Sequence, residues 1–299
     1  MEIRSFDSLE AAIEGCFGEG VREVKRSYVG GGDINDASCL LLSNGERIFV
    51  KSNTLANKSF FDAEEAGLNA IASTGAVRTP KLLCKGTDSR AGISFLMMEM
   101  IDEGRKSARS WETFGCELAG MHKSDTSAFV PSGKFGFFVD NYIGASKQIN
   151  TPKDTWIDFF RECRLEPQFK MAAGYFDSKF IKEMTRLLDR LDDLLTEPAS
   201  PSLLHGDMWS GNVMADETGR IMLIDPAAYV GHPEADIAMT ELFGRLPSEF
   251  YRAYAAGNLM QEGYGDRKDL YNLYHLTNHL NLFGSSYAYS VMNIVKRYV

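Results

Sequence analysis

A short segment in the second half of the chain combines side chains that suit phosphoryl transfer. His205, Asp207 and Asn212 form an H-G-D-x-x-x-x-N pattern, and the apolar run 221–224 leads into Asp225. Transfer of a phosphoryl group from ATP needs a carboxylate that accepts the proton of the attacking hydroxyl. It also needs oxygen ligands for Mg²⁺, which neutralises the phosphate charges. The spacing predicts Asp207 as the general base and Asn212 and Asp225 as magnesium ligands. We expect His205 to orient the loop through hydrogen bonds.

Lys51 stands at the end of a predicted strand, where its ammonium group can reach the phosphates of ATP. In folds of the protein-kinase type, such a lysine pairs with a glutamate of the following helix. The helix predicted here carries two candidates, Glu64 and Glu65, which point about 100° apart around the helix axis. We expect Glu64 to pair with Lys51 and Glu65 to face solvent.

A glycine run after the first predicted strand offers backbone groups to the phosphates. Glycine lets backbone N–H groups approach an anion closely, which favours Gly31 and Gly32 as nucleotide contacts. The run does not match G-x-G-x-x-G, and a flexible hairpin tip would have the same composition. Its position two strands before Lys51 favours the phosphate-binding interpretation.

The apolar strand 97–101 runs into the polar segment 102–106. In a two-lobed kinase, the backbone of such a connection presents C=O and N–H groups to the adenine ring. We therefore expect nucleotide contacts from the backbone of Glu99, Met100 and Ile101, without a required role for the Glu99 side chain. A buried strand that binds no ligand would have the same apolar pattern.

The elements that position these side chains change character along the chain. Strand patterns dominate before residue 101, with Asn44-Gly45 as a hairpin turn, and helical periodicity dominates afterwards. Two short strands are expected around the H-G-D loop. We predict an α+β, protein-kinase-like fold with a small β-rich lobe, residues 1–101, and a larger, mostly helical lobe, residues 102–299. The predicted strands cover 21–29, 37–42, 47–51, 81–85 and 93–100, and the predicted helices cover 6–17, 57–73, 110–123, 154–164, 177–195, 234–243, 248–256 and 267–289.

Composition limits the classes of partner. The chain has 299 residues, is 44% hydrophobic and carries a net charge of −9. Because nucleic acids and anionic membranes bind basic patches, we expect neither as a partner. No apolar stretch is as long as a membrane span and the N-terminus has no signal-peptide pattern, so we expect a cytoplasmic protein. Five cysteines without a C-x-x-C pair argue against zinc and disulfides, and we expect most of them to be buried thiols. The oligomeric state is not indicated.

Two departures from protein kinases narrow the class of enzyme. Pro226 follows Asp225, where protein kinases carry Phe-Gly, and neither an A-P-E anchor nor an activation-loop phosphorylation pattern is present. Without the mobile phenylalanine, we expect a site that is formed at all times. Both departures argue against a protein kinase.

Several motifs resemble the fructosamine kinase (ketosamine 3-kinase) family over about residues 21–284. They are HGDMWSGN, IDPAAYVGHPEADIAMTELFG, GGDIN, FVKSN, FFDAEEAGL, FGFFVDNYIG and WIDFFRECRLEPQ. The Trp-Ser-Gly of the loop and the GHPEAD segment set this family apart from aminoglycoside and choline kinases. The resemblance implies ATP-dependent phosphorylation of the sugar 3-hydroxyl of ketosamines, after which the unstable product releases the amine. It also implies a base at Asp207, metal ligands at Asn212 and Asp225, and phosphate positioning by Lys51 and Glu64.

Two features fit a sugar as the acceptor. Trp209 follows Asp207 by two residues, so its indole could form an apolar wall of the sugar site. A core tryptophan that packs the loop is the alternative. The aromatic- and glycine-rich segment 135–144 could lie over the acceptor, with Asp140 or Asn141 bonded to its hydroxyls. A surface loop with aromatic anchors is the alternative there.

The predicted substrate is a small-molecule ketosamine or a glycated protein, and two other functions stay open. The chain could phosphorylate another hydroxylated amine, such as an aminoglycoside or choline, although those enzymes would not require Trp209 together with segment 135–144. It could also be a pseudokinase that binds without turnover. Loss of any one of four residues would signal that outcome, and all are present: Lys51, Asp207, Asn212 and Asp225.

Overall fold

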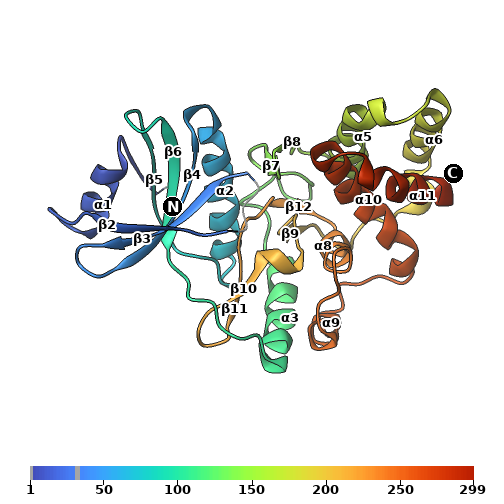
Figure 1. The fold of residues 1–299 in the computed structure, drawn as a ribbon. Helices are drawn as coiled ribbons and strands as arrows, with labels where there is room; N and C mark the ends of the chain where they lie inside the picture. Colours follow the sequence, from blue (N-terminus) through green and yellow to red (C-terminus); the bar gives the residue numbers. More distant parts are fainter. Residues whose placement is uncertain (1–2, 31–33) are drawn as a thin grey trace.

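The structure is a computed structural model that describes residues 3–30 and 34–299. An N-terminal part is built on one six-stranded sheet, and a larger C-terminal part is built mainly of helices (Figure 1). Short strands lie between the two parts (Figure 1). No helix in the described ranges has both the length and the apolar character needed to cross a membrane. The α+β arrangement, with the sheet part first, confirms the predicted fold class.

The N-terminal sheet has the strand order β1-β5-β6-β4-β3-β2, and its neighbouring strands are antiparallel except for β1 and β5. Alternate side chains of β3 are buried, as in a sheet with one face on a core. Gly45 turns the chain between β3 and β4 as predicted, with a φ of 88° that glycine adopts without strain. The strands are β1 (Arg4–Phe6), β2 (Glu23–Tyr28), β3 (Asp36–Leu42), β4 (Arg47–Thr54), β5 (Leu82–Asp88) and β6 (Ile93–Glu99), and the helices are α1 (Leu9–Phe17) and α2 (Lys58–Ser73).

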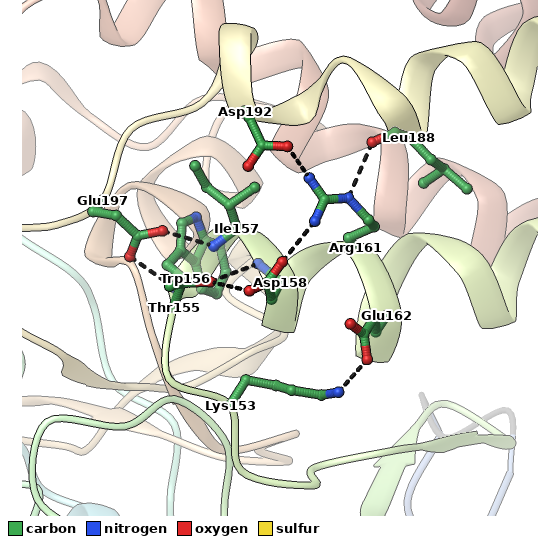
Figure 2. Close-up of polar contacts among 10 residues, drawn as sticks. All are labelled: Lys153, Thr155, Trp156, Ile157, Asp158, Arg161, Glu162, Leu188, Asp192 and Glu197. Carbon is green, nitrogen blue, oxygen red and sulfur yellow. Dashed lines mark hydrogen bonds and ion pairs between the residues drawn. The ribbon is translucent and has the colours of Figure 1, made fainter.

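The C-terminal part contains helices α3 to α11 and three two-stranded sheets. Helix α4 begins after Thr155, whose hydroxyl accepts from the N–H of Asp158 at 3.2 Å (Figure 2). The carboxylate of Glu197 accepts from the N–H groups of Trp156 and Ile157 (Figure 2). The helices are α3 (Ala108–His122), α4 (Trp156–Phe160), α5 (Glu166–Ala172), α6 (Ser178–Asp189), α7 (Leu191–Leu194), α8 (Pro233–Met239), α9 (Ser248–Ala255), α10 (Tyr264–Phe283) and α11 (Ala288–Tyr298). The paired strands are β7 (Asn141–Ile143) with β8 (Ser146–Gln148), β9 (Ser202–Leu204) with β12 (Tyr229–Gly231), and β10 (Val213–Ala215) with β11 (Ile221–Leu223).

The apolar core does not divide at the predicted boundary. Ala70 and Ile71 of α2, with Val77, pack into the large cluster formed by the helical part. A smaller cluster lies between α1 and the sheet. Helix α2 therefore precedes the boundary in sequence but joins both parts by packing. The division into 1–101 and 102–299 falls between the end of β6 and the start of α3, and it stays a prediction.

Some elements differ from the predicted ones. Strand β1 has three residues, too few for a periodic pattern. The predicted helix 154–164 passes into a π-helical turn, Arg161–Leu165, before α5 begins. The predicted helix 267–289 ends at Gly284, whose φ of 92° stops α10 before α11 starts. Of the five cysteines, Cys84 and Cys163 are buried, so the expectation that most are buried is wrong.

Candidate active site

Lys51, Glu64 and Asp225 form a charged cluster between the two parts of the molecule. Lys51 Nζ lies 2.6 Å from Glu64 Oε1 and also pairs with the carboxylate of Asp225. Burial alone would lower the pKa of the Lys51 ammonium, but Asp225 and Glu64 outweigh burial and raise it. Lys51 is therefore a fixed cation. The structure brings together the lysine, the first of the two glutamates and one expected metal ligand, as predicted.

Glu65 is buried, so the prediction that it faces solvent is wrong. Its side chain is 5% exposed and accepts from the backbone N–H of Ile3 at 3.0 Å. It also lies 2.8 Å from Nζ of Lys85. Helix α2 contacts β5, and Glu65 faces that strand instead of solvent. Adjacent glutamates of α2 thus have separate tasks, one in the charged cluster and one in attaching the helix to the sheet.

The loop 205–212 connects β9 to β10 and is held by a buried histidine. His205 Nε2 lies 2.8 Å from the carbonyl oxygen of Ile224, and the N–H of Asp207 donates to His205 Nδ1 at 3.3 Å. Burial lowers the pKa of His205, which keeps the ring neutral and consistent with one donating and one accepting nitrogen. The geometry matches the expected orienting role for His205.

Asp236 anchors the same loop and was missed in the sequence. Its carboxylate accepts from the backbone N–H groups of His205 at 2.7 Å and Gly206 at 2.9 Å, and it lies 3.3 Å from Nε2 of His122. Asp236 is 1% exposed, in helix α8. A lone carboxylate inside the otherwise apolar run Ala235–Met239 is the signal that could have identified it, because buried acids are paired or hydrogen-bonded.

Asp207 is partly buried, with an amide as its side-chain partner. Asn212 Nδ2 donates to the backbone oxygen of Asp207 at 2.8 Å and to its Oδ2 at 3.0 Å. Burial raises the pKa of Asp207 to about 7, although the Asn212 bond works against this rise. A carboxylate with so high a pKa has more affinity for a proton than an ordinary aspartate, which suits a general base.

Asp225 occupies an unusual backbone conformation. Its φ is 54°, in the left-handed region that aspartate enters at some cost. Its carboxylate is 46% exposed, and the next residue, Pro226, packs against α2. A β-carbon on Gly67 of α2 would lie 2.9 Å from Cγ of Pro226, so only glycine permits this close approach.

The residues near Asp225 fit a magnesium ion that is held together with phosphates. Asn212 donates through Nδ2, which leaves its Oδ1 for a cation, and the Asp225 carboxylate adds a second hard oxygen ligand. Within the described residues, no group of three or more His, Cys, Asp or Glu side chains could hold a metal alone. Two protein ligands plus phosphate oxygens and water are the usual arrangement for Mg²⁺.

The expected nucleotide contacts are described in part. Gly31 and Gly32 lie outside the described residues. Glu99 ends β6, and its side chain accepts from the backbone N–H of Lys81 at 2.8 Å, which agrees with no direct role for that side chain. Met100 and Ile101 follow β6 and are partly buried at the start of the segment that leads to α3.

Trp209 and Asp140 are both accessible. Trp209 is 38% exposed, and its ring lies over Gly211, where a β-carbon would be 2.4 Å from the indole. It is therefore not a core tryptophan. Asp140 accepts from the N–H of Asn150 at 2.9 Å and lies 3.2 Å from Nζ of Lys147, with part of its carboxylate exposed.

Asn141 does not fit the expected contact with a substrate. It is 1% exposed, and its Nδ2 donates to the carbonyl oxygen of Ala228 at 2.7 Å. Its Oδ1 accepts from Gln148 Nε2 at 2.7 Å and from Asn150 Nδ2 at 2.9 Å. Because strand alternation turns Asn141 inward, the side chain serves the structure of the segment, and the prediction for this residue is corrected.

Comparisons with known proteins identify the family. The family model for fructosamine kinase matches residues 5–299. The protein named "Probable ketoamine kinase" of Synechocystis sp. is 40% identical over 296 residues, 98% of this chain and 96% of the relative. The chloroplastic protein-ribulosamine 3-kinase of Arabidopsis thaliana is 40% identical over 284 residues, 94% of this chain and 85% of the relative. A crystal structure assigned as a fructosamine-3-kinase of Haemophilus somnus superposes with a TM-score of 0.87 at 26% identity, covering 98% of this chain and 97% of the other. The chain belongs to the fructosamine kinase family.

Proposed function

We propose that this protein is an ATP-dependent kinase that phosphorylates the 3-hydroxyl of ketosamines and so promotes their deglycation. The observation that carries the proposal is the partly buried Asp207, whose pKa is raised to about 7, in the same site as the Lys51, Glu64 and Asp225 cluster. Family membership supports the substrate class, because the similar proteins are named for ketoamine and ribulosamine phosphorylation.

Asp207 accepts the proton of the attacking hydroxyl. Asn212 fixes the carboxylate through Oδ2, and His205 and Asp236 fix the backbone of the loop. Preorganisation of this kind matters because phosphoryl transfer depends mainly on positioning and charge. Partial burial removes some of the water around the carboxylate and keeps the proton affinity of the base high.

Lys51 positions the phosphates of ATP, and Glu64 positions Lys51. The ion pair at 2.6 Å holds the ammonium of Lys51, which lies within β4 and not at its end as predicted, beside the exposed carboxylate of Asp225. Asn212 and Asp225 would hold Mg²⁺, which neutralises phosphate charge when bound. The backbone near Glu99, Met100 and Ile101 receives the adenine, and Gly31 and Gly32 approach the phosphates.

The exposed indole of Trp209 provides one wall of the sugar site. Its place two residues after Asp207 keeps it near any hydroxyl that reaches the base. Asp140 supplies a partly exposed carboxylate for a hydroxyl or for the cationic amine of the substrate. We also propose that the protein acts in the cytoplasm, on free or protein-bound amines.

The deciding experiment measures ATP consumption with ribulosamine, fructosamine and glycated lysozyme, beside choline and kanamycin. We expect turnover with at least one ketosamine and much lower kcat/KM for choline and kanamycin. A better rate with choline or kanamycin would replace the proposal with a general small-molecule kinase. No turnover with any acceptor, together with intact ATP binding, would favour a pseudokinase.

A further inference from the structure

Arg164 is a fully buried arginine that has no carboxylate partner. Its exposed fraction is 0%, and among the described residues no acidic side chain lies within 4.0 Å of its guanidinium nitrogens. The guanidinium lies over two neighbouring aromatic rings, 4.0 Å from the centroid of Tyr229 and 4.5 Å from that of Phe159. Such contacts stabilise a cation, but a buried charge without a counter-ion is still costly compared with an apolar side chain of the same length.

A π-helical turn directs Arg164 inward. The turn covers Arg161–Leu165, and π-helical turns are often found at functional sites. Arg161 lies on the same turn and points outward instead: it bonds Asp158 and the carbonyl oxygen of Leu188, and it also pairs with Asp192 (Figure 2). The two arginines are close in sequence but have different surroundings, which makes Arg161 a matched comparison for Arg164.

Arg164 holds the chain that follows strand β8. Its Nη1 donates to the carbonyl oxygen of Ile149 at 2.6 Å, and its Nη2 donates to Oδ1 of Asn150 at 2.8 Å. Asn150 then donates through Nδ2 to Oδ1 of Asn141 at 2.9 Å. Arg164, Asn150 and Asn141 are all buried, so the bonds between these three side chains form a continuous chain away from solvent.

The chain of hydrogen bonds ends on the segment that carries Asp225. Asn141 donates to the carbonyl oxygen of Ala228 at 2.7 Å, and Gln148 donates to that of Ala227 at 3.0 Å. These two carbonyls belong to the second and third residues after Asp225, and the N–H of Ala227 also bonds the carbonyl oxygen of His205 at 2.9 Å. The left-handed backbone of Asp225 therefore lies directly before a segment that is held by hydrogen bonds from the β7–β8 hairpin and from His205.

We propose that Arg164 is a positioning residue for Asp225, acting through Asn150, Asn141 and Gln148. The guanidinium fixes the β7–β8 hairpin, and the hairpin fixes the backbone that aims the Asp225 carboxylate at the metal. The proposal rests on the proposed function only in assigning Asp225 to the metal. It explains why a costly buried cation is present where an apolar side chain would fill the same space.

The test compares Arg164→Met with Arg161→Met as the control from the same turn. Mn²⁺ is titrated calorimetrically into each variant in the presence of a non-hydrolysable ATP analogue, and melting temperatures are measured in parallel. We expect Arg164→Met to weaken Mn²⁺ binding about tenfold or more, as for other residues that orient metal ligands. Arg161→Met should leave Mn²⁺ binding within about twofold, the change expected for a residue outside that shell. Arg164→Lys should lie between, since one ammonium cannot reproduce both Nη contacts.

Asn141→Ala tests the same chain of hydrogen bonds at a second position, and it decides whether the chain positions Asp225 if Arg164→Met does not fold. It should weaken Mn²⁺ binding as Arg164→Met does, and the double variant should be no worse than the poorer single variant, because both break one chain. Mn²⁺ binding within about twofold of the parent in both single variants would overturn the proposal, whatever their melting temperatures. Asp225→Ala tests whether Asp225 binds the metal at all. Unchanged Mn²⁺ binding in this variant would remove Asp225 from the metal site and, with it, the positioning role of Arg164. Ketosamine turnover does not enter these measurements, so an error in the assigned acceptor would leave them intact.

Discussion

Asp207 and Asp225 are the same side chain in two contrasting regions of one site. Asp207 is partly buried on a loop, bonded to an amide, and its pKa is raised to about 7. Asp225 is 46% exposed and faces the ammonium of Lys51. Surroundings of these two kinds separate a proton acceptor from a charged ligand without any change of residue type.

The two regions are also held in different ways. The loop of Asp207 is held by hydrogen bonds to the carboxylate of Asp236 in helix α8, within the helical part. The segment of Asp225 is fixed by α2 through Pro226 and by the β7–β8 hairpin through Asn141. The loop of Asp207 is thus held from within the helical part, while the segment of Asp225 is held by elements of both parts.

Removing the proton acceptor should have the largest effect. Asp207→Asn keeps the shape of the side chain but loses its basicity, so kcat should fall about 10²- to 10⁴-fold. Turnover with a ketosamine and the melting temperature should be measured on the same preparation. A kcat within a few-fold of the parent, in a folded variant, would contradict the role of Asp207.

Disturbing the charged cluster should have the next largest effect. Lys51→Ala and Glu64→Ala should each raise the KM for ATP, by about tenfold or more, and the double variant should add little, because the pair acts as a unit. Fully additive effects would separate the two side chains.

Glu65→Ala is the matched control for this cycle. It should lower the melting temperature, since it leaves the N–H of Ile3 without its partner and Lys85 with Asp62 alone, but the KM for ATP should stay close to that of the parent. A larger effect of Glu65→Ala than of Glu64→Ala on ATP use would reverse the assignment of the two glutamates.

Trp209→Ala should affect the acceptor side alone and more modestly. Loss of an indole wall should reduce kcat/KM for the ketosamine about tenfold, equivalent to about 1.4 kcal/mol, with little change in the KM for ATP. Because Trp209 is partly exposed, the melting temperature should change little. A variant that loses ATP affinity instead would place the indole on the nucleotide side.

The smallest expected effect is a gain in folding stability of Asp207→Asn at high pH. The pKa of Asp207 is raised in the folded protein to about 7 from an ordinary value near 3.8, so the folded state binds the extra proton between those two pH values. Stability should therefore fall as pH rises through this window, and Asp207→Asn should escape that loss. We expect the melting temperature of Asp207→Asn to exceed that of the parent by about 2 °C or more at pH 8. The difference in melting temperature should shrink toward pH 4.5. An equal difference at both pH values would contradict the raised pKa of Asp207 in the folded protein.

The fold class could be predicted, and the groups that we propose to react could be proposed, because both depend on local sequence. Strand and helix periodicity, the Asn44-Gly45 turn and the spacing from Asp207 to Asn212 are all contained in short segments. Lys51 and Glu64 needed one further step, the order of a strand and a helix. These predictions survive because neighbouring residues constrain one another directly.

The remaining residues depend on contacts between distant segments. Glu65 was expected in solvent because no local signal places β5 against that face of α2. Asn141 was assigned to the substrate because its polar side chain gives no sign of the buried carbonyl of Ala228 that it meets. Asp236 and Arg164 escaped notice for the same reason, since each acts on backbone groups more than ten residues away.

The contact of Gly67 with Pro226 bears on the state of the site between turnovers. The helix of Glu64 is packed against the proline that follows Asp225, and Lys51, Glu64 and Asp225 are in contact without a bound nucleotide, so we expect little chain entropy to be lost there on binding. We therefore expect that no separate activation event governs the rate. Such an enzyme works as a standing clearance step, whose throughput rises and falls with the supply of adducts and of ATP.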